Sequence, residues 1–348
     1  MRLFLYIILA LLPLHVMAKS TLATANADNE QQLLKLLDSY IDKRNTYSEI
    51  KEEKIKRLKL KLRTADNNSS RLSLLNTIYH EYYTYSYDSA MVYANRGLAL
   101  AQSVNNAYYT TLNRINRAAV LSTGGFYSQA ETLLNEIGEN NVPHQLKQYY
   151  YYTTTWLYSY WEAFCDKSEF KDYYRQKKLQ FLRLTVNTTH SNYVGLYAYL
   201  SGELAYLENP LGKNVLRHYT IAINNSPVNS RVHASAAYCI ARYYREMGNM
   251  QLYEKYIIEA AISDMVCPLK ENLALQELST YLYKKDTKYA DRAARYIYCS
   301  MEDAKFYNNR LRMLEISSIL PIIATANQEA LAHKERIVRG VLAVVSFL

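Results

Sequence analysis

The residues best suited to bind a ligand are aromatic, and they cluster between positions 149 and 161. This stretch carries both tryptophans of the chain and several of its 36 tyrosines. On the inner face of a helical array, such rings stack on sugars or grip an extended peptide. Tyr150, Trp156 and Trp161 are therefore the candidate residues of a ligand groove. Core packing is the alternative, because aromatic residues at helical spacing are usually buried.

One pair of carboxylates next to this cluster could act as a catalytic acid and base. Glu162 and Asp166 are four residues apart, beside Trp161, and could cleave a glycosidic bond. Such pairs are also common on the solvated faces of helices. The chain contains no GxSxG, Walker, GxGxxG or HExxH arrangement. The sequence therefore predicts a protein that is not an enzyme and that uses no cofactor.

Histidine and cysteine do not form a recognisable metal-binding pattern. Seven histidines are scattered along the chain without ligand spacing, so no metal site is predicted. Four cysteines, Cys165, Cys239, Cys267 and Cys299, lack a CxxC pair. An even number permits two disulfides in an exported protein, but the irregular spacing favours free, buried thiols.

The composition indicates which elements position these side chains. The chain has 348 residues, of which 49% are hydrophobic and 21% charged, so it is not disordered. Only nine glycines and six prolines are present, too few for a sheet-rich fold with many tight turns. A net charge of +9 would suit nucleic acid or an anionic membrane surface.

The N-terminus has the pattern of an exported protein. An apolar run follows Arg2 and ends before the small residues Val16 and Ala18. This predicts a signal peptide over 1–18, cleaved after Ala18. Export separates the chain from DNA, so we predict no nucleic-acid partner and interpret the basic stretch Lys54–Arg63 as a solvated helix face.

A polar leader and a long N-terminal helix are expected over 19–69, the helix running from Gln31 to Arg63. Connecting helices are expected over 302–336, with an interruption at Pro321. The apolar run 337–348 predicts the start of a truncated transmembrane helix, because it is apolar around its whole circumference. An apolar helix that packs on the rest of the protein is the alternative.

Between these ends lies an internal repeat, predicted over 70–301. Four segments share an apolar helix, a turn and a second helix, and Ala90, Ala130, Tyr253 and Ala293 occupy equivalent places early in the second helix. The steps from 90 to 130 and from 253 to 293 are both 40 residues. A helical hairpin repeated at this period predicts a solenoid, with these four residues in the contacts between helices.

The predicted turns lie at Tyr87–Asp88, Gly124–Tyr127, Met247–Asn249 and Lys285–Thr287. The sequence around these turns resembles tetratricopeptide repeats, in which small residues let the two helices of a hairpin meet. The residues that match best are Ala118, Gly125, Tyr127, Ala130, Leu134 and Ile137. The fold class expected is therefore all-α, a tetratricopeptide-like solenoid of helical hairpins with a long N-terminal helix.

Several sequence segments, taken together with their order along the chain, resemble a known family. The segments include GGFYSQAETLLNEI (124–137) and SMEDAKFYNNRLRMLEISSILPIIATA (300–326). They resemble envelope-anchored bacterial proteins with tetratricopeptide repeats and a domain of unknown function, often labelled transcriptional regulators. The resemblance implies a periplasmic sensor that is anchored in the cytoplasmic membrane, with its C-terminal output region absent from this chain.

On that basis the expected function is non-enzymatic binding of a peptide, glycan or protein ligand in a groove of the repeats. The resemblance implies that occupancy of this groove is transmitted through the 302–335 helices to the membrane. A periplasmic adaptor for envelope complexes is the alternative, and a glycan-cleaving envelope protein is a third possibility. The resemblance supplies no agreed ligand and no catalytic residues.

Overall fold

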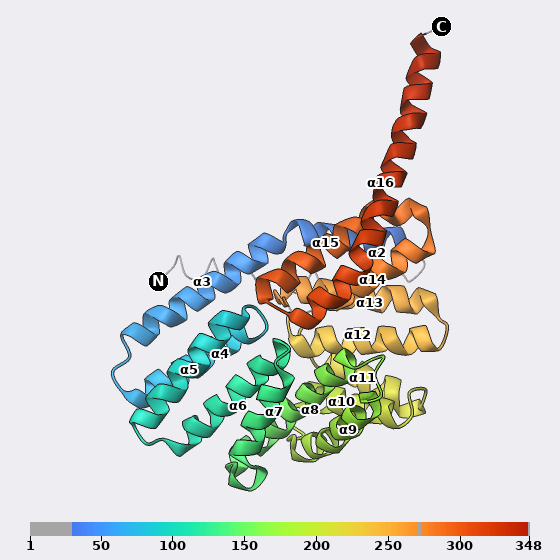
Figure 1. The fold of residues 1–348 in the computed structure, drawn as a ribbon. Helices are drawn as coiled ribbons and strands as arrows, with labels where there is room; N and C mark the ends of the chain where they lie inside the picture. Colours follow the sequence, from blue (N-terminus) through green and yellow to red (C-terminus); the bar gives the residue numbers. More distant parts are fainter. Residues whose placement is uncertain (1–29, 271–272, 347–348) are drawn as a thin grey trace.

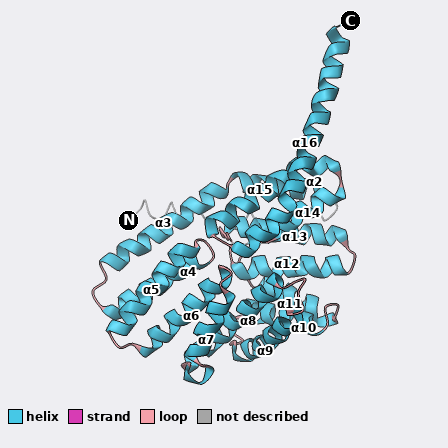
Figure 2. Ribbon diagram, in the orientation of Figure 1, coloured by secondary structure: helices cyan, strands magenta, loops and turns pink. Residues whose placement is uncertain are grey.

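The computed structural model describes residues 30–270 and 273–346, and every regular element within them is helical (Figures 1 and 2). The helices, in chain order, are α2 (Glu30–Asp42), α3 (Arg44–Arg63), α4 (Asn68–Tyr83), α5 (Tyr87–Ser103), α6 (Ala107–Thr123), α7 (Tyr127–Ile137), α8 (Lys147–Phe164), α9 (Lys171–Thr188), α10 (Val194–Glu208), α11 (Lys213–Asn224), α12 (Arg231–Glu246), α13 (Met250–Val266), α14 (Ala274–Lys285), α15 (Ala290–Tyr307) and α16 (Arg310–Ser346). The predicted signal peptide lies outside the described residues.

Helices α4 to α15 form successive hairpins that stack side by side along an arc (Figure 1). The hairpins are α4–α5, α6–α7, α8–α9, α10–α11, α12–α13 and α14–α15. Each hairpin buries the apolar stripe of its helices against its neighbours, which is how a solenoid builds a continuous core. The predicted all-α, tetratricopeptide-like solenoid is confirmed.

The predicted packing residues share one place in their helices. Ala90, Ala130, Tyr253 and Ala293 are each the fourth residue of their helix, in α5, α7, α13 and α15. None of the four is more than 2% exposed. Alanine lets the neighbouring helix approach closely at this position. Tyr253 instead extends its ring to Tyr281, with ring centroids 5.0 Å apart.

Two predicted turns lie where glycine permits an unusual backbone. Gly125 and Gly248 have φ angles of 84° and 72°, in the region that favours glycine. They join α6 to α7 and α12 to α13. The turn predicted at Tyr87–Asp88 is wrong, because α5 already begins at Tyr87 and the chain turns over residues 84–86. Asp88 instead places a negative charge in the first turn of α5, where the helix dipole favours it.

The N-terminal segment forms two helices where one was predicted. The break at Lys43 separates α2 from α3 because the two helices pack on different partners: α2 lies against α13 and α3 lies mainly against α4. A single straight helix could not make both contacts. The apolar face of α2 enters the core of the later hairpins through Leu33, Leu34, Leu37 and Ile41.

The C-terminal helices also differ from the prediction, because Pro321 does not interrupt α16. Helix α15 ends at Tyr307, and Asn308 after it adopts a left-handed conformation. Asn309 then caps α16, because its side-chain oxygen accepts a hydrogen bond from the Arg312 N–H. Ile316 and Ile323 are buried on either side of Pro321, so packing outweighs the lost backbone hydrogen bond. The end of α16 projects away from the array (Figure 1).

None of the described helices is both long enough and apolar enough to cross a membrane.

The segment before the array folds back onto the last hairpin, because α2 docks there. Asp38 pairs with Arg292 at 2.9 Å and accepts a hydrogen bond from the Tyr296 hydroxyl at 2.8 Å. Glu30 pairs with Lys285 at 2.9 Å. These contacts join residues about 250 positions apart in the chain and place α2, which precedes the array, beside the array's last hairpin (Figure 1).

Candidate functional site

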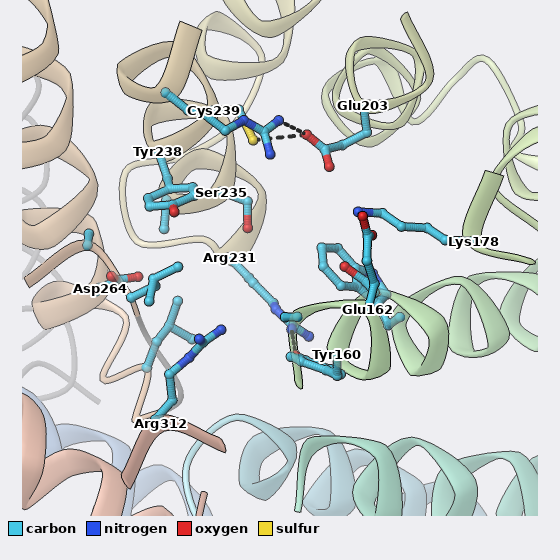
Figure 3. A pocket seen from close by; sticks show the side chains of 18 of the residues that line it. Tyr160, Glu162, Lys178, Glu203, Arg231, Ser235, Tyr238, Cys239, Asp264 and Arg312 are labelled. Atoms are coloured by element: carbon cyan, nitrogen blue, oxygen red, sulfur yellow. Dashed lines mark hydrogen bonds and ion pairs between the residues drawn. The ribbon is translucent and has the colours of Figure 1, made fainter. Parts of the chain in front are cut away.

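A cavity of about 390 Å³ lies among α8, α9, α10, α12 and the first turns of α16 (Figure 3). Small-molecule sites usually measure about 300–1,000 Å³. The cavity is therefore large enough for a short peptide or glycan, and too small for a folded protein domain.

Aromatic rings form part of its wall. Trp156 and Tyr160 lie one turn apart on α8 and so share a helix face. The Trp156 ring is nearly parallel to that of Tyr199 on α10, with centroids 6.5 Å apart. Tyr238 of α12 lies across the cavity (Figure 3). Such rings offer flat, apolar contact to a ligand whose polar groups point elsewhere.

A buried carboxylate organises one end of the cavity. Glu203 of α10 accepts hydrogen bonds from Arg242 at 2.7 Å, from the Tyr219 hydroxyl at 2.6 Å and from the Cys239 thiol at 3.2 Å. Burial raises the pKa of Glu203, but Arg242, Lys178 and these hydrogen bonds outweigh it and lower the pKa to about 2. The pair therefore stays charged and fixes α10 against α12.

Further charges line the remaining wall. Lys178 of α9 pairs with Glu162 at 3.2 Å. Arg231 of α12 lies over the Trp156 ring, 5.7 Å from its centroid, and donates to the Tyr160 hydroxyl at 3.3 Å. The whole cavity wall carries five basic and five acidic side chains, so a ligand need not carry net charge to enter.

Three buried N–H donors at the cavity have no acceptor among the described residues. They are Nε1 of Trp156, Nε of Arg242 and Nε of Arg312. An unsatisfied buried donor costs about 1–3 kcal/mol, and such groups are rare in folded proteins. These three atoms have almost no accessible surface, so a ligand with oxygen acceptors would reach them only after the surrounding side chains move aside.

The structure brings one of the three predicted groove residues into this cavity, Trp156. Tyr150 is 4% exposed, and its hydroxyl donates to the Leu134 carbonyl in the core of the α6–α8 region. Trp161 is half-buried and stacks on Tyr174, with ring centroids 4.3 Å apart. Tyr150 and Trp161 therefore pack between helices.

The candidate pair of carboxylates is split between two lysines. Glu162 pairs with Lys178, whereas Asp166 pairs with Lys171 at 2.6 Å. Each carboxylate is held by its own cation, which is unlike the arrangement of an acid and a base across a scissile bond.

All four cysteines are free thiols in the structure, and Cys239 and Cys299 are buried. Burial and the neighbouring Glu203 raise the pKa of the Cys239 thiol well above its ordinary value. This thiol lines the cavity and should react slowly with alkylating reagents as long as it stays buried.

Sequence reasoning missed the charged residues of the site, Glu203, Arg242 and Arg312. The available signal was a single charge inside an otherwise apolar stretch. Glu203 is the only charged residue between Val194 and Leu207, and Arg242 follows a run of small and apolar residues in α12. A lone charge on a helix that must be buried needs a partner, and that partner is often functional.

The fold and this cavity define a tetratricopeptide repeat domain, a helical scaffold that serves protein–protein interaction and is typically not catalytic. The family model of the SusR N-terminal TPR domain matches residues 41–318, which is most of the chain. The chain therefore belongs to this family. No curated protein matches it.

Proposed function

We propose that this chain is the non-enzymatic, ligand-binding region of an exported regulatory protein that is anchored to the cytoplasmic membrane. The cavity carries the proposal, because it combines aromatic walls with buried donors that lack acceptors. A short peptide or a glycan is the ligand class that suits its size and chemistry. The N-terminal pattern at residues 1–18 supports export to the periplasm.

The membrane attachment would involve the end of α16. Ile337, Val338, Val341, Leu342 and Val345 are all more than half exposed, although they are large and apolar. Exposed apolar surface of this extent commonly marks a contact with a membrane or a partner. We propose that this end of α16 lies at the membrane and carries the state of the cavity to it.

A cavity-filling variant tests the ligand-binding role. Ser235 is half-buried and lines the cavity on α12 (Figure 3), so Ser235→Phe should occupy the ligand volume. Libraries of short peptides and of envelope oligosaccharides would be screened for a rise in the melting temperature. The matched control is Ser128→Phe, at an exposed position of α7. Stabilisation that persists in Ser235→Phe would exclude this cavity as the binding site.

An adaptor for envelope complexes is the second candidate, and one surface feature favours it. Phe164, Phe170 and Tyr173 are each more than half exposed around the α8–α9 turn. Affinity purification from envelope extracts would test this role. A partner protein that is lost on Phe170→Ser, with the cavity intact, would favour the adaptor over the sensor.

A further inference from the structure

Two apolar cores of the molecule meet on the first turns of α16. Leu311 packs into the core formed by α6, α7 and α8. Ile316 packs into the larger core formed by α2 and the hairpins from α9 to α15. Both side chains are at most 5% exposed. Residues 311–316 of one helix therefore bridge the two apolar cores.

Between these two anchors, α16 contributes directly to the cavity. Arg312 and Glu315 line it and pair with each other at 2.6 Å. Gln276 of α14 also donates to Glu315, at 3.4 Å. A ligand that reaches the Nε of Arg312 would therefore touch α16 itself as well as the wall of the array.

The turn from α15 into α16 is held by further contacts to distant hairpins. The Tyr307 hydroxyl donates to the Tyr83 carbonyl at 2.8 Å and lies 2.7 Å from Oγ1 of Thr123. Arg310 stacks over the Phe126 ring, 4.0 Å from its centroid. Most of these contacts are polar or aromatic and lie at a turn, so they can break without loss of the hairpins.

We propose that residues 307–316, here called the latch, close the cavity and couple its opening to the movement of α16. The inference deepens the proposed function and rests on it, since it states how a ligand in this cavity would be transmitted. Packed cores switch between discrete arrangements and do not stretch continuously. Leu311 and Ile316 are held at a fixed separation by one helix, so a change in the spacing of the two cores must move α16 relative to at least one of them.

A designed disulfide tests whether the latch closes the cavity. A Cβ atom at Gly125 would lie 3.4 Å from Cβ of Arg310, close to the separation of about 3.5–4.5 Å in disulfides. The full chain carrying Gly125→Cys and Arg310→Cys would be oxidised, or reduced and desalted, and then treated with iodoacetamide. Mass spectrometry would follow the labelling of Cys239, which lines the cavity.

We expect Cys239 to react at least about tenfold more slowly in the oxidised form than in the reduced form, because the latch can no longer open. Cys299, which is buried on α15 away from the cavity, should react equally in both. Gly125→Cys alone controls for the strain of a side chain at a φ of 84°. Equal labelling of Cys239 in both forms, or failure of the disulfide to form, would overturn the latch.

A second variant addresses the coupling to α16. Leu311→Ala removes one anchor and should speed both the labelling of Cys239 and the amide hydrogen exchange of residues 317–336, while Cys299 stays unchanged. Faster labelling without faster exchange in α16 would refute the coupling. Because neither measurement uses a ligand, a failed ligand screen and a failed latch are separate outcomes.

Discussion

At the scale of single residues, several contacts together keep the buried Glu203 ionised. A carboxylate at 7% exposure is stable only if its partners compensate for lost solvent. Arg242 supplies the charge, and Tyr219 and Cys239 supply further donors. The arrangement holds Arg242 in place, and its buried Nε has no acceptor in the described chain.

Glu203 should make the protein sensitive to acid. Its pKa is lowered from 4.5 to about 2, so its stabilising contribution is complete above about pH 4.5 and is lost as the pH falls towards 2. The shift corresponds to roughly 3 kcal/mol. Urea denaturation at pH 6, 4 and 3 should show a fall in unfolding free energy that is shallower in Glu203→Gln, which is already less stable at pH 6.

The matched control for this experiment is Glu136→Gln, which alters an exposed pair with Arg114. Its pH dependence should follow that of the unchanged chain. If the unfolding free energy of Glu203→Gln shows the same pH dependence as that of the unchanged chain, Glu203 does not determine the loss of stability in acid.

Spacing along a helix shows which residues share a face, but which face turns inward depends on the tertiary structure. Trp156 lines the cavity because the side chains of Trp156 and Tyr160 share a face of α8, a relation that spacing alone describes. Tyr150 is on the same helix but is rotated into the core, and four consecutive tyrosines give no sign of which one faces inward. Arg312 reaches the cavity only through the turn at Asn308, which sequence reasoning did not predict.

At the scale of helices, close approach depends on glycine at the α10–α11 contact. A Cβ atom on Gly202 would lie 2.6 Å from the Tyr219 ring, which is too close for an ordinary contact. Gly202→Ala should therefore overpack this crossing and cost about 1–3 kcal/mol of unfolding free energy, measured by chemical denaturation. The change should also disturb the Tyr219 hydrogen bond to Glu203.

Gly340→Ala is the matched control, because nothing lies within 4 Å of a Cβ atom at that position of α16. Alanine in place of glycine usually favours a helix by about 0.5–1 kcal/mol. Gly202→Ala should thus lower the unfolding free energy, whereas Gly340→Ala should raise it or leave it unchanged. Equal behaviour of both would contradict the tight α10–α11 contact.

The docking of α2 rests on Asp38 more than on its neighbours. Asp38 contacts Arg292 and Tyr296, and its side chain is 21% exposed, whereas Asp42 is 68% exposed beside Arg295. Asp38→Ala should lower the unfolding free energy by about 1–3 kcal/mol, and Asp42→Ala by less than about 1. Similar losses for the two variants in thermal or urea unfolding would show that α2 is held mainly by its apolar face.

At the scale of the whole molecule, the sequence predicts the array but not its closure. Period and composition describe neighbouring hairpins, because those contacts lie within about 40 residues. The contacts of α2 with α15, and of Tyr307 with Thr123, join residues more than 180 positions apart. Nothing in a local pattern specifies how far a superhelix must turn before its ends meet. The break at Lys43 allows that closure, because it lets α2 lie against the later hairpins while α3 lies against α4.

The end of α16 separates the membrane hypothesis from simple packing. Ile337, Val338, Val341 and Leu342 are exposed, and Gly340 has no neighbour within 4 Å. Deletion of residues 337–348 should therefore shift the melting temperature by no more than about 2 °C. The same deletion should reduce the fraction of protein that sediments with lipid vesicles, because these side chains are the apolar surface offered to the bilayer.

Ile322→Lys, at an exposed site of α16 nearer the array, should leave sedimentation unchanged. A fall of several degrees without a change in vesicle binding would mean that the segment docks on the protein, and the attachment to the membrane would then have to be abandoned.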